Sequence, residues 1–167
     1  MCNIAGYSGD KQAAPILLEM LAKQELYDGD MSTGIATIHE GKLYYKKIIG
    51  NVDKFLQEID LSELPGTIGI AHTRPGGNVG TIPMHPNLNP SETMALITNG
   101  TTPATKYCTR WDQAADLLEQ NGYTFEQRSP NPNGVSPKVS SNGDAISPAE
   151  MRVHLIDLYL KQGKNIT

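Results

Sequence analysis

Two β-rich runs joined by a two-residue turn constrain the fold of this chain more than any other feature. The runs cover residues 32–39 (Ser-Thr-Gly-Ile-Ala-Thr-Ile-His) and 42–49 (Lys-Leu-Tyr-Tyr-Lys-Lys-Ile-Ile), and Glu40-Gly41 lies between them. A short connection that contains glycine favours a tight antiparallel hairpin. A helical pattern follows at residues 52–58, so the sequence predicts an antiparallel sheet that is covered by a helix.

Hydrophobic periodicity predicts further elements on both sides of this hairpin. Strands are expected at residues 3–8, 67–73 and 93–98, and helices at 15–24, 111–120 and 148–161. The apolar residues of the first helix should share one buried face: Ile16, Leu17, Met20 and Leu21. The last helix should begin with Ser147 as N-cap, Pro148 in the first helical position and Glu150 bonding back to the cap. Residues 127–146 show no period and should form an irregular excursion.

The size and composition of the chain limit its class. A length of 167 residues suits one domain with a core, so we expect a single α+β domain over residues 1–167. A net charge of −4 without a basic cluster argues against nucleic-acid binding, and no apolar run is long enough for a membrane span or a signal peptide. Cys2 and Cys108 form neither a disulfide framework nor a metal-ligand pattern. We therefore expect a cytoplasmic protein with no metal, no cofactor, no nucleic-acid partner and no membrane partner.

Cys2 carries the sharpest functional hypothesis because it follows the initiating Met1. If Met1 is removed, the thiol and the free α-amine belong to one residue. A thiol titrates near ~8.5 and an α-amine near ~7.7 to 8.0, so the amine can take the thiol proton directly or through one water. The alternative is that Cys2 is a small buried apolar residue at the start of an edge strand.

Two other segments carry groups that suit a reaction at this thiol. Arg74 ends an apolar strand beside a glycine-rich turn, where its planar guanidinium could hold a carboxylate with two hydrogen bonds, although a surface ion pair is the simpler interpretation. Asn99-Gly100 ends another strand and could offer a side-chain amide and a backbone N–H to an oxyanion, although this dipeptide is usually a turn. The small residues of 31–36 allow close approach of a neighbouring backbone. We interpret His72 and His85 as buried or turn residues rather than metal ligands.

Taken together, these segments resemble the glutaminase domain of the class II glutamine amidotransferases, which belong to the N-terminal nucleophile hydrolases. The shared motifs occur in the same order in this chain: Met1-Cys2-Asn3-Ile4-Ala5-Gly6-Tyr7, Ser32 to Ala36, Gly69-Ile70-Ala71-His72-Thr73-Arg74, His85-Pro86 and Asn99-Gly100. The segments His154-Leu155-Ile156 and Tyr159 to Gly163 also resemble the family. The resemblance spans nearly the whole chain. Within this family, the motifs are most similar to those of glucosamine-6-phosphate synthase.

The resemblance implies a fold and a set of roles. The fold would be an αββα sandwich of mostly antiparallel sheets, incomplete at its C-terminal side. Cys2 would be the nucleophile, Asn99 and Gly100 the oxyanion hole, and Arg74 the anchor for the glutamine carboxylate. His72 and Thr73, in the same motif as Arg74, would be further substrate-binding residues. The substrate would be glutamine or a γ-glutamyl compound, and a synthase partner or a homo-oligomer would be the partner protein.

The chain also departs from the family pattern. Pro75-Gly76-Gly77-Asn78-Val79 replaces the family's Trp-Ala-Thr-His-Gly, and Pro148 falls where the family has the aspartate that binds the substrate's ammonium group. Asp144 is the candidate to replace that aspartate. Asn3 replaces a glycine and Thr98 a histidine. Two alternatives therefore stand beside glutamine hydrolysis: a binding or regulatory homologue that has lost turnover, and an N-terminal-cysteine hydrolase that acts on another γ-glutamyl amide.

Overall fold

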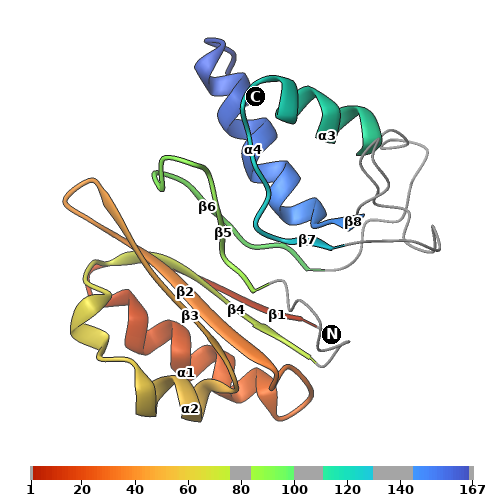
Figure 1. Cartoon of the computed structure of the whole chain (residues 1–167). Helices are drawn as coiled ribbons and strands as arrows, with labels where there is room; N and C mark the ends of the chain where they lie inside the picture. The colour runs from red at the N-terminus through yellow and green to blue at the C-terminus, as the bar shows by residue number, and fades with distance from the viewer. Residues whose placement is uncertain (1, 76–83, 100–110, 130–144, 166–167) are drawn as a thin grey trace. The chain divides into compact units, whose positions relative to one another are not determined.

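The computed structural model of the chain describes residues 2–75, 84–99, 111–129 and 145–165 (Figure 1). The chain divides into two compact units: residues 1–87 with 95–100, and residues 88–94 with 101–167. The expected single domain over residues 1–167 stays a prediction. No helix in the described ranges combines the length and the apolar character needed to cross a membrane.

An antiparallel sheet forms the centre of the first unit. Its strands are β1 (Asn3–Ser8), β2 (Ser32–His39), β3 (Lys42–Ile49) and β4 (Ile68–Arg74), in the order β1-β4-β2-β3. The predicted hairpin is confirmed with its predicted bounds, and Glu40 and Gly41 take positive φ angles of 49° and 75°. Two consecutive positive φ angles give the turn whose twist matches the paired strands.

Two helices cover one face of this sheet: α1 (Ala13–Glu25) and α2 (Val52–Glu58) (Figure 1). The short 3₁₀ helix η1 (Leu61–Glu63) follows them. Apolar side chains of both helices and of the strands form the core, for example Leu17, Leu18, Phe55, Ala5 and Ala71. The predicted buried face of α1 was partly wrong, since Met20 is 39% exposed whereas Ala14 and Leu18 are buried. The stripe that faces the sheet is therefore rotated toward positions 14, 17, 18 and 21.

The second unit contains α3 (Trp111–Gln120) and α4 (Pro148–Lys161), which pack against each other. The two ends of the predicted irregular excursion pair antiparallel as β7 (Arg128–Ser129) and β8 (Ala145–Ile146), whereas residues 130–144 lie outside the described residues. The predicted start of α4 is confirmed, but its predicted capping is wrong. The Ser147 side chain makes no cap bond, and the buried Glu150 carboxylate accepts the backbone N–H groups of Glu126 at 2.7 Å and Gln127 at 2.9 Å.

A small two-stranded sheet consists of β5 (Asn87–Leu88) and β6 (Ala95–Leu96). The predicted strand at 93–98 is thus limited to two residues. The buried Asn89 side chain holds the turn that follows β5, because its Oδ1 accepts the backbone N–H groups of Thr93 and Met94, both at 2.9 Å. Asn89 also donates to Asp157 on α4 at 2.8 Å. Helices combined with antiparallel strands confirm the predicted α+β class.

Candidate functional site

Cys2 and Arg74 lie at the same end of the β1–β4 strand pair. Cys2 directly precedes β1, and its thiol is half-buried and free of any disulfide. Strands β1 and β4 pair antiparallel, with Asn3 opposite Thr73 and Ile4 opposite His72. Continuing this register by one residue brings Cys2 opposite Arg74, the last residue of β4. Residues that are directly opposite in an antiparallel pair point to the same face and lie close together.

Arg74 is held on its other side by β2. Ser32 is its partner in the β2–β4 pairing, and the Met31 N–H donates to the Arg74 carbonyl at 2.9 Å. Because side chains alternate along strands, Arg74, His72, Ser32 and Gly34 share one face of the sheet. The opposite face carries Ala71, which belongs to the core under α1. The Arg74 face is thus the face that α1 and α2 do not cover.

Thr73 points to the helix-covered face and is fully buried. Its hydroxyl accepts a hydrogen bond of 2.9 Å from the Asn3 side-chain amide, which also donates to the Asp28 carbonyl at 2.6 Å. The substrate-binding role of Thr73 stays a prediction, and its described contact is this bond to Asn3. Sequence reasoning identified Asn3 only as a difference from the family glycine, because the sequence gives no signal for the tertiary contacts of its side chain.

His72 and His85 stack on each other inside the first unit. Their ring centroids are 4.1 Å apart with an interplanar angle of 31°, and their exposures are 1% and 7%. Asn87 Nδ2 lies 3.2 Å from Nδ1 of His85. Neither ring nitrogen of His72 is in full hydrogen-bonding geometry with a described group, although the Thr98 backbone lies close enough to the ring to raise its pKa. The interpretation of these histidines as buried residues is confirmed.

Burial keeps both rings neutral. It lowers the pKa of His72 to about 3, and the neighbouring His85 ring and Arg74 add to the effect, whereas the Thr98 carbonyl opposes it. Burial likewise lowers the pKa of His85 to about 4, with the Leu96 backbone opposing the shift and two cations, Arg74 and Lys47, contributing to it. Desolvation disfavours the charged form of a histidine, which explains the direction of both shifts.

These contacts also locate the segment that ends at Asn99. The Leu96 backbone lies near the His85 ring and the Thr98 carbonyl near the His72 ring, so residues 96–98 run beside the histidine pair. Asn99 follows directly and is exposed. The first unit therefore gathers Cys2, Arg74 and His72 at one end of the sheet, with Thr98-Asn99 next to His72. The other predicted residues, Gly100 and Asp144, lie outside the described residues, as does Cys108.

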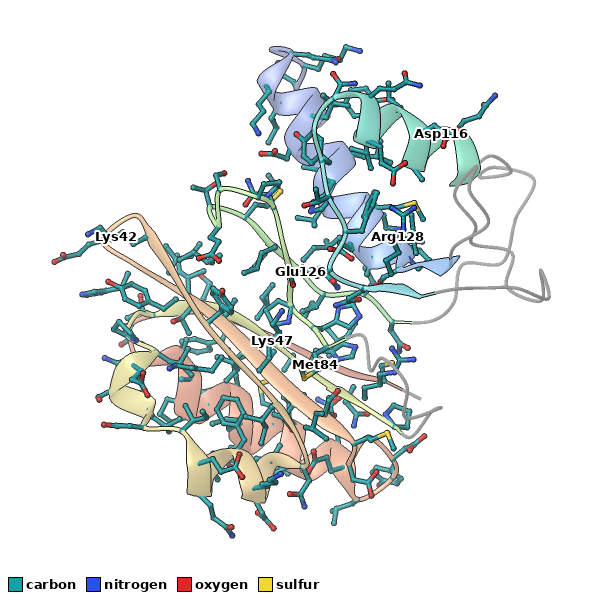
Figure 2. All side chains as sticks on the ribbon, in the orientation of Figure 1. Lys42, Lys47, Met84, Asp116, Glu126 and Arg128 are labelled. Carbon is teal, nitrogen blue, oxygen red and sulfur yellow. The ribbon has the colours of Figure 1, made fainter. Side chains whose placement is uncertain are left out.

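One cation on this face was not singled out from the sequence. Lys47, labelled in Figure 2, lies on β3. It pairs with Gly34, which pairs in turn with His72, so these residues form one row across the sheet. The Lys47 ammonium also lies 5.8 Å from the centre of the Tyr45 ring. Sequence reasoning treated residues 44–47 as an ordinary alternating strand, and only the register reveals this row.

Within the described ranges, no three His, Cys, Asp or Glu side chains gather where they could bind a metal ion.

Gly34 leaves room for the segment that carries His85, and this gives a prediction about stability. A Cβ on Gly34 would lie 1.8 Å from the His85 carbonyl oxygen, whereas a Cβ on Gly6 of β1 would meet nothing within 4 Å. Gly34→Ala should therefore reduce the free energy of unfolding by about 3 kcal/mol or displace residues 84–87. Gly6→Ala is the matched control and should be neutral or slightly stabilising. Urea unfolding followed by circular dichroism measures both, and equal stabilities would contradict the described packing.

Comparisons with curated proteins find glutamine–fructose-6-phosphate aminotransferases among the relatives of this chain. The chain is 39% identical over 127 residues to a glutamine–fructose-6-phosphate aminotransferase (isomerizing) of Caldanaerobacter subterraneus. The matched region covers 75% of this chain and 20% of the relative. The enzyme of the same name from Clostridium tetani is 32% identical over 163 residues, covering 96% of this chain and 23% of the relative. The chain thus spans about a fifth of the length of the curated relatives that it matches. No protein-family model matches it.

A solved structure shares the fold. The glutamine phosphoribosylpyrophosphate amidotransferase of B. subtilis superposes with a TM-score of 0.61 over 92% of this chain and 29% of that chain, at 23% sequence identity. Similarity at this level of identity concerns the fold. It confirms the expected fold type of mostly antiparallel sheets and helices, with a sheet that is not closed.

Proposed function

We propose that this chain hydrolyses the side-chain amide of glutamine with Cys2 as the nucleophile. The proposal is supported by homology to the glutaminase region of the glutamine–fructose-6-phosphate aminotransferases and by a fold shared with a glutamine amidotransferase. One observation carries the proposal: the β1–β4 pairing ends with Asn3 opposite Thr73, so the residues that come next, the half-buried Cys2 and Arg74, lie at the same end of the sheet. A nucleophile and a carboxylate anchor would then face one substrate molecule.

The proposed reaction begins once Met1 is removed. The free α-amine of Cys2 takes the thiol proton, and the thiolate attacks the amide carbon of glutamine. The side-chain amide of Asn99 and the backbone N–H of Gly100 donate to the oxyanion that forms. The C–N bond then breaks, the α-ammonium returns its proton to the leaving nitrogen, and ammonia departs. Water cleaves the thioester, releasing glutamate and regenerating the thiol.

Arg74 would fix the orientation of the substrate. A guanidinium presents two parallel N–H donors to a carboxylate, so it can bind the α-carboxylate of glutamine in a defined direction. His72, two residues earlier on the same face, is neutral and buried. We propose that it shapes the floor of the site. Thr73 and Asp144 remain candidates for further contacts with the substrate.

The ammonia needs an acceptor. The curated relatives are named for an amino transfer to fructose 6-phosphate, and this chain matches about a fifth of their length. We propose that a synthase domain or a separate synthase partner in the cytoplasm uses the ammonia, with a homo-oligomer as a further form of assembly. No nucleic acid, membrane, metal or cofactor takes part in this proposal.

The two alternatives differ from this proposal in measurable ways. A binding or regulatory homologue would bind glutamine without releasing ammonia. A hydrolase for another γ-glutamyl amide would release an amine from that compound but little ammonia from glutamine. Pro75, directly after Arg74, supports both alternatives. A proline has no backbone N–H, so the residue after the carboxylate anchor lacks a donor that other residues supply.

The test is covalent labelling of the mature protein by a diazo-ketone analogue of glutamine, followed by intact-mass and peptide analysis. We expect one adduct per chain, on the Cys2 sulfur, and protection by excess glutamine. The matched control is the same protein with Met1 retained, which should react much more slowly because the α-amine is then an amide. Protein that lacks Met1 and reacts with iodoacetamide at Cys2, but not with the glutamine analogue, would reject the proposal.

A further inference from the structure

The Asn3 side chain connects three segments of the first unit through hydrogen bonds. Its side-chain Nδ2 donates both hydrogens, to the Asp28 carbonyl at 2.6 Å and to the Thr73 hydroxyl at 2.9 Å. Asp28 belongs to the connection between α1 and β2, and Thr73 to the end of β4. The amide therefore ties the start of β1 to a loop and to the neighbouring strand.

The packing around this amide is close. Gly29 has a φ of 113°, and a Cβ there would lie 2.4 Å from Asn3 Nδ2 and 2.7 Å from the Thr73 hydroxyl. The Gly29 N–H in turn donates to the Asp28 carboxylate at 2.9 Å. Only a residue without a side chain fits a positive φ at such a contact. The loop is thus shaped around the Asn3 side chain, and we refer to Asn3, Asp28, Gly29 and Thr73 as the amide clamp.

The amide clamp lies one residue from the proposed nucleophile and one residue from the proposed carboxylate anchor. Cys2 precedes Asn3, and Arg74 follows Thr73. In the sheet that the described residues form, β1 lies at the edge and pairs with β4 alone, and strand ends of this kind fray. The side-chain bond from Asn3 to the loop gives the start of β1 a second attachment. Because side chains alternate, holding Asn3 on the helix-covered face turns Cys2 toward the face of Arg74.

We propose that Asn3 is a positioning residue, whose two donated hydrogen bonds fix the Cys2 thiol relative to the Arg74 guanidinium. The catalytic meaning of this inference rests on the function proposed above. The placement of the thiol by Asn3 does not depend on that function. The amide clamp thus gives this chain its own means of setting the distance between the nucleophile and the carboxylate anchor.

The experiment compares Asn3→Gly and Asn3→Asp in a Cys108→Ser background, where Cys2 is the only thiol, with Met1 removed. Asn3→Asp keeps the side-chain size and loses both donors. Asn51→Ala is the matched control, since Asn51 is another half-buried asparagine of this unit, and its Oδ1 caps α2 by accepting from the Lys54 N–H at 3.0 Å. Urea unfolding shows whether the three variants lose similar stability.

Two rates report the position of the thiol. The first is the ratio of Cys2 alkylation by iodoacetate, which Arg74 attracts, to alkylation by neutral iodoacetamide, with Arg74→Gln giving the value without attraction. The second is the limiting rate of labelling by the glutamine diazo ketone. We expect both Asn3 variants to move the ratio toward the Arg74→Gln value and to lower the limiting rate about 10- to 100-fold. Asn51→Ala should leave both within twofold.

The outcomes separate the two proposals. Asn3 variants that keep the ratio and the limiting rate within twofold of the parent would overturn the positioning role, even if labelling supports glutamine chemistry. A parent protein that the diazo ketone does not label, together with a ratio that falls in the Asn3 variants, would overturn the proposed function and support the amide clamp. Equal losses in Asn51→Ala and the Asn3 variants would assign the effect to general stability and would also overturn the positioning role.

Discussion

Cys2→Ala is expected to release no measurable ammonia from glutamine, a loss on the order of 10⁴-fold or more relative to the protein without Met1. The proposed mechanism forms a thioester on the Cys2 sulfur, and alanine provides no atom that can form it. Residual hydrolysis would come only from substrate binding and the oxyanion donors. A coupled ammonia assay at saturating glutamine measures the loss directly.

The control for this variant is Cys108→Ala, which removes the other thiol of the chain. It should keep ammonia release close to that of the parent, because Cys108 has no proposed role in the reaction. Circular dichroism should show that Cys2→Ala folds normally, since Cys2 is half-buried and lies outside the apolar core. Ammonia release that persists in Cys2→Ala would exclude this cysteine as the nucleophile.

Local sequence patterns predicted the elements that local chemistry determines. The hairpin of β2 and β3 has its predicted bounds because Glu40-Gly41 fits the turn conformation that joins twisted strands. The start of α4 was predicted because Pro148 suits the first turn of a helix. Its capping was not predicted, because the Glu150 carboxylate bonds to the N–H groups of residues 126 and 127 instead of its own helix start. Contacts between distant segments override a local motif of this kind.

The candidate site was also predictable from the sequence only in part. The residue types at Cys2, Arg74 and Asn99-Gly100 are visible in the sequence, whereas their alignment depends on the register of β1 with β4. A shift of one residue would turn Cys2 to the helix-covered face, and no local signal fixes this register. The stacking of His72 on His85 and the contacts of Asn3 are tertiary in the same sense. Spacing alone could therefore suggest the groups and not the face on which they meet.

The histidine pair should make the first unit sensitive to mild acid. In the folded protein, burial holds the pKa of His72 at about 3 and that of His85 at about 4, whereas an unfolded histidine binds a proton near ~6.5. Below about pH 6.5 the unfolded state therefore binds more protons than the folded state, so stability falls as the pH falls. Each histidine contributes a slope of about 1.4 kcal/mol per pH unit, and the pair about 2.7, between about pH 6.5 and pH 4.

Urea unfolding of the first unit between pH 7.5 and pH 4.5 measures this slope, with hydrogen exchange of the β2 and β4 amides as the local probe. Replacing His85 by glutamine should remove about half of the slope of stability against pH. One titrating group is lost, whereas glutamine still provides a polar side chain. His39→Gln, at a side chain that is 47% exposed, is the matched control for a histidine-to-glutamine change outside the buried pair. In the folded protein, the NMR signals of the His72 and His85 rings should not titrate between pH 7.5 and pH 5. Signals that shift with a midpoint near ~6.5 would mean that water reaches the rings, and the buried stack would then be wrong.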